Sequence, residues 1–302
     1  MTRRLAALDI GSNSTRLLVA DADCERLEEV ERLLTITRLG DGVDASGRLA
    51  EDAMQRVARC VGRYAERASE LGAERPLAVA TSAVRDAANG RDFLARLERD
   101  HGVRTRLLAG EDEARLTLRG VASGRAMEGP VVVCDIGGGS TELIAGTGDD
   151  VRFAISLDMG CVRLSERHLR DDPPTAEQVE AVREEVTKLL PDDVPPGDLI
   201  GVAGTITTLA TIDLDLEEEV PELVDGHVLE QPTVEAELAR LAGLPLEQRR
   251  SVRGLMPERA PTIVAGAAIL AQLMAELEVQ RLSVSERDIL HGAALAAGDP
   301  GS

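Results

Sequence analysis

Apolar and polar positions alternate between two patterns along the chain, and together they predict a mixed α/β protein. Short apolar runs typical of strands cover residues 5–10, 17–20, 77–81, 104–108, 131–134, 153–157 and 199–203. Apolar positions at helical spacing predict an amphipathic helix over residues 51–71, and residues 111–121 predict another. Thr175 and Gln178 have the spacing of a capping box, which predicts a helix that runs to residue 190.

The longest apolar stretch, residues 263–275, is interrupted by Gln272 and is too short to span a bilayer, so it predicts a buried helix. The first residues, MTRRLAALDI, run directly into a strand-like segment, and we therefore expect a cytoplasmic protein without a signal peptide. Cys24, Cys60, Cys134 and Cys161 show no paired spacing, which favours reduced thiols over disulfides or a zinc site. The histidines form no metal-binding motif.

One segment occurs twice, each time after an apolar run. DIGSNSTRLL covers residues 9–18 and DIGGGSTELI covers residues 135–144, and six of the ten positions are identical at an offset of 126. The simplest interpretation is a duplicated α/β domain with a cleft between the copies, with residues 1–124 in the first domain and 125–302 in the second. The last helix of the second domain is expected to pack back on the first. The alternative is a chance echo of a common turn.

The glycines of the second copy suggest an anion site. Glycine allows a ligand to approach the main chain closely, so the amides of Gly137, Gly138 and Gly139, with the hydroxyls of Ser140 and Thr141, suit phosphate oxygens. In the first copy the corresponding positions are Gly11, Ser12, Asn13 and Ser14. The structural alternative is a tight hairpin with an Asx-type cap.

An acid at the end of each strand completes this pattern. Asp135, and Asp9 in the first copy, would repel a phosphate unless a divalent cation stood between them. The sequence therefore predicts Mg²⁺ as cofactor, with Mn²⁺ as the other candidate. A third glycine segment, with Gly204 and Thr205, follows the strand at 199–203 and could bind phosphate, although a helix N-terminus with hydroxyl caps explains it equally.

The charge of the chain restricts the classes of partner. A net charge of −20 argues against nucleic acid and membrane surfaces. Residues 1–124 hold 20 arginines against 21 acids, whereas residues 125–302 hold 14 basic residues against 33 acids. The first half is thus where a polyanion could be held, since arginine forks suit phosphate oxygens.

At these turns the sequence resembles the exopolyphosphatase / guanosine pentaphosphate phosphatase family, part of the superfamily of sugar kinases, actin and heat-shock chaperones. The matching stretches are DIGSNSTRLLV, ATSAVRDAANG, LLAGEDEARLTLRGV, DIGGGSTEL, SLDMGCVRLSE, GVAGTITTLA and PERAPTIVAGAAIL. The resemblance implies duplicated actin-like (ribonuclease H-like) domains. Family members often carry a further helical region with a histidine–aspartate type domain, which residues up to Ser302 do not contain. On that basis we expect a preference for short polyphosphate chains.

The resemblance also implies roles for individual residues. Glu113 matches the acid that activates the attacking water, and mutual repulsion with its acidic neighbours Glu111 and Asp112 would increase its basicity. From the residues alone, acids at a helix N-terminus merely favour the helix dipole. Asp135 and Glu142 match acids associated with Mg²⁺ and catalysis, and Arg85 matches a phosphate-contacting arginine, with a solvated helix-end charge as the alternative. The turn residues Asn13, Ser14 and 137–140 would hold the terminal phosphates.

These observations predict a hydrolase that removes terminal orthophosphate from linear polyphosphate. Guanosine pentaphosphate is the alternative substrate, and it is disfavoured because Tyr64, Phe93 and Phe153 are the only aromatic residues available for stacking a base. A sugar kinase-like ATP user and a non-catalytic polyphosphate or nucleotide sensor are the remaining alternatives. A homodimer is compatible with the sequence but rests on no motif.

Overall fold

The computed structural model describes residues 3–23, 27–127, 129–147 and 150–299. The chain divides into two compact units, one formed by Met1–Ala126 with Arg287–Ser302 and one formed by Met127–Glu286. The C-terminal segment, which the sequence analysis assigned to the second domain with a helix packing back on the first, thus belongs to the first unit. Cys24 lies outside the described residues.

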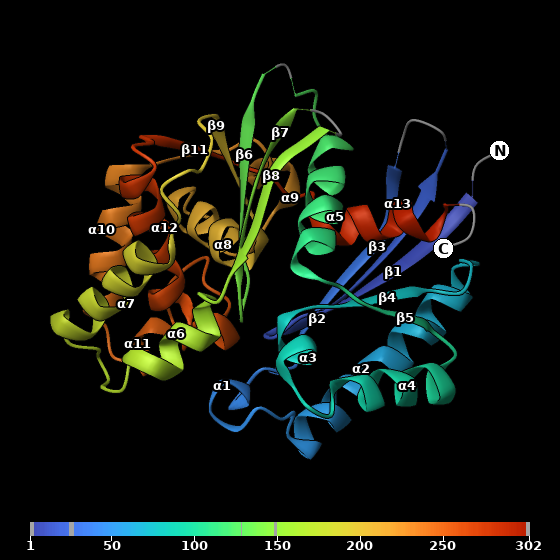
Figure 1. Cartoon of the computed structure of the whole chain (residues 1–302). Helices are drawn as coiled ribbons and strands as arrows, with labels where there is room; N and C mark the ends of the chain where they lie inside the picture. The colour runs from blue at the N-terminus through green and yellow to red at the C-terminus, as the bar shows by residue number, and fades with distance from the viewer. Residues whose placement is uncertain (1–2, 24–26, 128, 148–149, 300–302) are drawn as a thin grey trace. The chain divides into compact units, whose positions relative to one another are not determined.

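The first unit alternates strands and helices, as the pattern of its apolar positions predicts (Figure 1). Its elements are β1 (Arg3–Ile10), β2 (Ser14–Ala22), β3 (Leu27–Ile36), α1 (Val43–Ser46), α2 (Glu51–Glu70), β4 (Leu77–Ala80), α3 (Ser82–Asp86), α4 (Gly90–His101), β5 (Arg104–Leu107), α5 (Gly110–Ala122) and α13 (Ile289–Ala297). The strand order is β3-β2-β1-β4-β5, in which β1 pairs antiparallel with β2 and parallel with β4.

The sheet of the first unit is covered on both faces. Alternate residues of β1 enter two separate cores, because successive side chains of a strand point to opposite faces. Ala6, Leu8 and Ile10 pack in the core that contains the apolar face of α2. Leu5 and Ala7 pack in the core that contains α13, together with Leu116 of α5. Asp9 shares the face of Leu5 and Ala7, which is the face that α13 covers.

The second unit repeats this plan with additional helices. Its elements are β6 (Val131–Ile136), β7 (Thr141–Thr147), β8 (Asp150–Leu157), α6 (Cys161–His168), α7 (Ala176–Leu189), β9 (Asp198–Val202), α8 (Ala203–Asp213), α9 (Pro221–Val224), β10 (Val228–Glu230), α10 (Gln231–Ala242), α11 (Leu246–Arg249), the 3₁₀ helix η1 (Pro257–Arg259), α12 (Ile263–Glu276) and β11 (Arg281–Val284). The strand order is β10-β11-β9-β6-β7-β8. Apart from β10, this is the order of the first unit with the same parallel and antiparallel pairs, which confirms the duplicated α/β architecture.

The elements predicted from strong periodicity are confirmed within a few residues. The buried positions of α2 include Met54, Val57, Val61 and Tyr64, and the capping box at Thr175 is present. The predicted buried helix at 263–275 is α12, whose central residues are fully enclosed. In the described part of the chain, no helix has the length and apolar content needed to cross a membrane.

Candidate active site

The two sequence repeats form the same hairpin. In the first unit the amide of Gly11 donates to the carbonyl of Ser14 at 2.9 Å, and in the second unit the amide of Gly137 donates to the carbonyl of Ser140 at 3.0 Å. The strand register before each turn is also the same, since Asp9 lies opposite Arg16 and residue 135 lies opposite residue 142. The repeated sequence therefore adopts the same backbone conformation in both units.

The loop that follows β3 fixes the peptide planes of the first turn. The amide of Gly40 donates to the carbonyl of Ser12 at 2.8 Å, and the amides of Thr37 and Arg38 donate to the carbonyl of Asn13 at 3.0 and 2.9 Å. Because the C=O and N–H of a trans peptide unit point in opposite directions, the next amides, those of Asn13 and Ser14, point away from this loop. A β-carbon at Gly40 would lie 2.9 Å from the Ser12 side chain, so this close approach requires glycine.

Helix α6 fixes the second turn in the same manner. The first amides of α6 donate to the carbonyls of Gly137 and Gly138 at 2.8–3.2 Å, and Nε of Arg163 donates to the carbonyl of Gly139 at 2.7 Å. The following amides, those of residues 138–140, therefore point away from α6. Three successive amides with this orientation are donors of the kind that suits phosphate oxygens.

Gly160 permits this contact, since a β-carbon there would lie 2.3 Å from the carbonyl of Gly138. Gly160 and Arg163 are site-building residues that our reasoning from the residues missed. Both lie within the stretch SLDMGCVRLSE, so the resemblance contained the signal that could have identified them.

The strand-end acid of the first turn is paired within the protein. Asp9 is buried, and its Oδ2 accepts from Nε and Nη2 of Arg16 at 2.9 and 2.7 Å. Its Oδ1 is buried and has no hydrogen-bond partner. Burial raises the pKa of Asp9 despite the nearby Arg16 charge, which agrees with one oxygen having no donor.

The strand-end acid of the second turn faces another acid. Asp135 and Glu142 are directly opposed across β6 and β7, and both are buried. Side chains directly opposed in an antiparallel pair lie on the same face of the sheet, so the two carboxylates are neighbours. Glu142 accepts from the hydroxyl of Ser156 at 2.7 Å. Burial and the charges of these two acids raise the pKa of the Cys134 thiol.

This donor set fits a hard divalent cation. Two adjacent buried carboxylates in the second unit, and the unpartnered Oδ1 of Asp9 in the first, are oxygen ligands of the kind that Mg²⁺ prefers. Among the described residues no group of three or more acidic, histidine or cysteine side chains could hold a metal. Mg²⁺ sites of one or two carboxylates commonly take their other ligands from water and substrate phosphates, so the acid pair is consistent with such a site.

Glu113 lies in the first turn of α5 and is buried. Its Oε2 accepts from Nη1 of Arg85 at 2.9 Å, and Arg85 also donates to the carbonyl of Leu108 at 3.2 Å. Arg85 is thus held inside the unit and is not the solvated helix-end charge considered above. Of its acidic neighbours, Glu111 is exposed and lies 4.0 Å from Arg115, and Asp112 is partly exposed and lies 3.4 Å from Arg106. Arg85 is the positive charge that the structure places on the Glu113 carboxylate.

Gly204 and Thr205 lie in the first turn of α8, as the helix alternative predicts, but no side chain caps the start of this helix. The preceding residue, Ala203, has a φ of 71°, a conformation that costs free energy in a residue other than glycine. Nη1 of Arg259 donates to the carbonyl of Gly204 at 2.6 Å, and a β-carbon at Gly204 would lie 2.7 Å from the guanidinium carbon. Arg259 is a further residue that our sequence reasoning did not identify.

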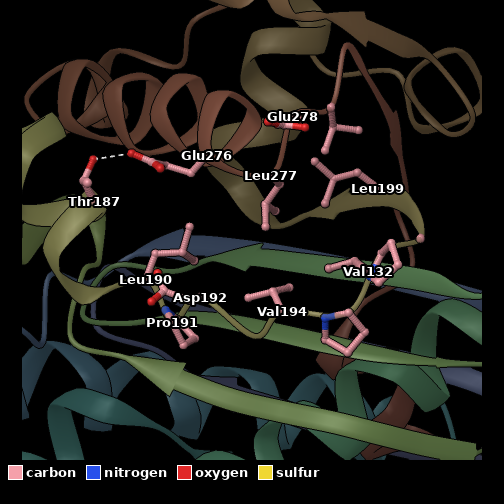
Figure 2. A pocket seen from close by; sticks show the side chains of 14 residues that line it. Val132, Thr187, Leu190, Pro191, Asp192, Val194, Leu199, Glu276, Leu277 and Glu278 are labelled. Atoms are coloured by element: carbon pink, nitrogen blue, oxygen red, sulfur yellow. Dashed lines mark hydrogen bonds between the residues drawn. The ribbon is translucent and has the colours of Figure 1, made fainter.

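A cavity of about 340 Å³ in the second unit lies at the other end of the strands (Figure 2). Val132 and Leu199, near the starts of β6 and β9, contribute to its lining, whereas the glycine turn follows the end of β6. None of the residues assigned to the turns lines this cavity. It is therefore separate from the candidate site.

Comparison with known proteins identifies the family. The chain is 37% identical to exopolyphosphatase 2 of Mycobacterium tuberculosis over 97% of its own length and 98% of that protein. Among solved structures, the Ppx/GppA family member of Aquifex aeolicus has a TM-score of 0.84 and 35% identity, with 98% of this chain and 97% of that chain covered. An exopolyphosphatase from Cytophaga hutchinsonii has a TM-score of 0.88 and 25% identity, with 96% of each chain covered. Residues 18–297 match the model of the Ppx/GppA phosphatase family, and the chain belongs to that family.

Proposed function

We propose that this chain is an exopolyphosphatase that releases terminal orthophosphate from linear polyphosphate in a reaction that requires Mg²⁺. The observation that carries the proposal is a pair of hairpins with the same backbone conformation. In each hairpin the amides of the turn point away from the segment that supports it, which is the loop after β3 in the first unit and α6 in the second. The relatives named as exopolyphosphatases match almost the whole chain, which supports this substrate class.

Substrate binding is assigned to the turns. Amides of residues 138–140, and those of Asn13 and Ser14, would donate to non-bridging phosphate oxygens, which every polyphosphate presents. Because these donors are fixed by hydrogen bonds on the protein side, little reorganisation is needed when charge develops on the transferred phosphoryl group.

Within the second unit, the cation would be held by Asp135 and Glu142, which are adjacent across β6 and β7. When bound, Mg²⁺ neutralises charge on phosphate oxygens and thereby favours nucleophilic attack. The protein's own contribution is to hold these buried carboxylates in fixed register at the strand ends.

Glu113 is assigned the role of orienting and deprotonating the attacking water. Its carboxylate is buried in the first turn of α5 and held by Arg85, so it cannot rotate freely into solvent. Arg85 would shift its hydrogen bonds from Glu113 to a phosphate oxygen as substrate binds, which would leave the carboxylate free to accept a proton. The arginine fork thus links the presence of substrate to activation of the base.

Phosphate release from polyphosphate, guanosine pentaphosphate and ATP, measured side by side with Mg²⁺, tests the proposal. We expect polyphosphate to be hydrolysed with the highest kcat/KM. Preference for guanosine pentaphosphate would assign the chain the nucleotide activity instead. Tight polyphosphate binding with no release from any substrate would identify a sensor and contradict the proposal.

A further inference from the structure

The C-terminal helix α13 carries a buried acid that reaches the first turn. Asp288 caps α13, where its Oδ1 accepts from the amide of Leu290 at 2.9 Å. Its Oδ2 accepts from Nη1 of Arg16, so the guanidinium of Arg16 bridges Asp288 and Asp9. These carboxylates are both buried, and a buried ion pair of this kind is strongly perturbed when one partner is removed.

A second contact holds α13 to the same sheet. His291 is fully buried, and its Nε2 lies 3.0 Å from Oε1 of Glu29 on β3. Its Nδ1 accepts from the amide of Asp288 at 3.3 Å, which completes the cap of the helix. Helix α13 is thus connected to β2 through Arg16 and to β3 through Glu29.

Helix α13 also touches the backbone of α5, the helix that carries Glu113. A β-carbon at Gly120 of α5 would lie 1.8 Å from the carbonyl oxygen of Asp288, and one at Gly292 would lie 1.9 Å from the carbonyl oxygen of Leu116. Glycines at the crossing let the two helices approach backbone to backbone, so a shift of one displaces the other (Figure 1).

We propose that Asp288 is a positioning residue for hydrolysis: through Arg16 it fixes Asp9 at the first turn, and through the contact of α13 with α5 it fixes Glu113 relative to that turn. The inference rests on the proposed exopolyphosphatase function. Asp288 itself does not touch substrate. Its effect is to keep the water-activating carboxylate and the strand-end acid in a constant mutual geometry, on which the rate of an oriented reaction depends steeply.

The experiment compares wild type with Asp288→Asn and with the matched control Asp299→Asn. Asparagine caps helices as well as aspartate, so Asp288→Asn removes the charge and keeps the cap. Asp299 pairs with Arg119 of α5 at 2.7 Å and also joins the C-terminal segment to α5, but at the exposed surface. We expect Asp288→Asn to lower kcat for polyphosphate about tenfold with KM changed less than about twofold, and Asp299→Asn to match wild type.

Arg16→Lys is the second variant and decides the result if Asp288→Asn does not fold. A lysine ammonium keeps the charge but cannot bridge two carboxylates as the guanidinium fork does, so we expect a similar loss of kcat. The double variant is expected to lose no more than either single one, whereas two unrelated destabilising changes would add.

Wild-type kcat in Asp288→Asn or in Arg16→Lys would overturn the proposal, as would equal losses in Asp299→Asn. Absence of polyphosphate hydrolysis by the wild type would instead refute the proposed function, so the two failures are distinguishable.

Discussion

The two repeated turns have the same backbone but differ in the charge of one side chain, the one directly opposite the strand-end acid. Opposite the strand-end acid, the first unit has Arg16 and the second has Glu142. In the first unit the acid is therefore paired with an arginine of the same hairpin, whereas in the second unit two acids are adjacent. The duplication has preserved the backbone of the turn and has changed the charge opposite the strand-end acid. We propose that this difference allows the second turn, and not the first, to bind a metal ion.

The largest effect on kcat is expected from a substitution of Glu113, which lies on α5 of the first unit. Glu113→Gln keeps the shape of the side chain and removes the proton acceptor, so kcat should fall about 10³-fold with the unfolding midpoint little changed. Steady-state phosphate release and thermal unfolding provide the two measurements. Glu111→Gln is the control, because Glu111 is exposed on the same helical turn. Turnover within a fewfold of wild type in Glu113→Gln would remove this residue from the mechanism.

The second-largest effect on kcat is expected from a change in the acid pair of the second turn, Asp135 and Glu142. Glu142→Gln removes one of two adjacent carboxylates, and we expect kcat to fall about 10²-fold and the half-saturating Mg²⁺ concentration to rise. EDTA should abolish wild-type activity and Mg²⁺ should restore it. Asp150→Asn, at an exposed position of the same sheet, is the matched control. An unchanged Mg²⁺ requirement in Glu142→Gln would place the metal elsewhere.

A smaller effect is expected where α6 supports the glycine turn. Gly160→Ala places a methyl group against the backbone of Gly138, so the turn must shift. We expect about a tenfold loss of kcat/KM and a loss of about 2 kcal/mol in the free energy of unfolding. Gly129→Ala is the control, since a β-carbon there meets nothing within 4 Å. Equal behaviour of the two variants would show that the turn does not depend on this contact.

The sequence predicted the repeat, the strands around each turn and the helices with strong periodicity, because these depend on local apolar spacing. It did not predict β3, whose residues LEEVERLLTI mix apolar and polar positions without strict alternation and are mostly only partly buried or exposed, since the strand lies at the edge of its sheet. The Arg16–Asp288 pair was also missed, because its partners are 272 residues apart and no local pattern connects them. Contacts of that kind are products of tertiary packing.

The electrostatic contrast between the turns also predicts a small pH effect on stability. Burial alone would raise the pKa of Asp288, but the Arg16 charge and the contact with His291 outweigh it and hold that pKa below its usual value. An acid with a lowered pKa in the folded state stabilises the fold above its unfolded pKa of about 4, and this contribution is lost as the pH falls below that value.

Asp288→Asn should therefore lower the free energy of unfolding by about 2 kcal/mol at pH 7, and the difference from wild type should shrink between pH 4 and pH 2. Urea unfolding monitored by circular dichroism at several pH values measures it. Glu142→Gln, which relieves repulsion between like charges in the metal-free protein, should show no such loss at pH 7. A difference between wild type and Asp288→Asn that stays constant with pH would mean that the first turn is held by packing. The ion pair between Arg16 and Asp288 would then contribute no net stabilisation.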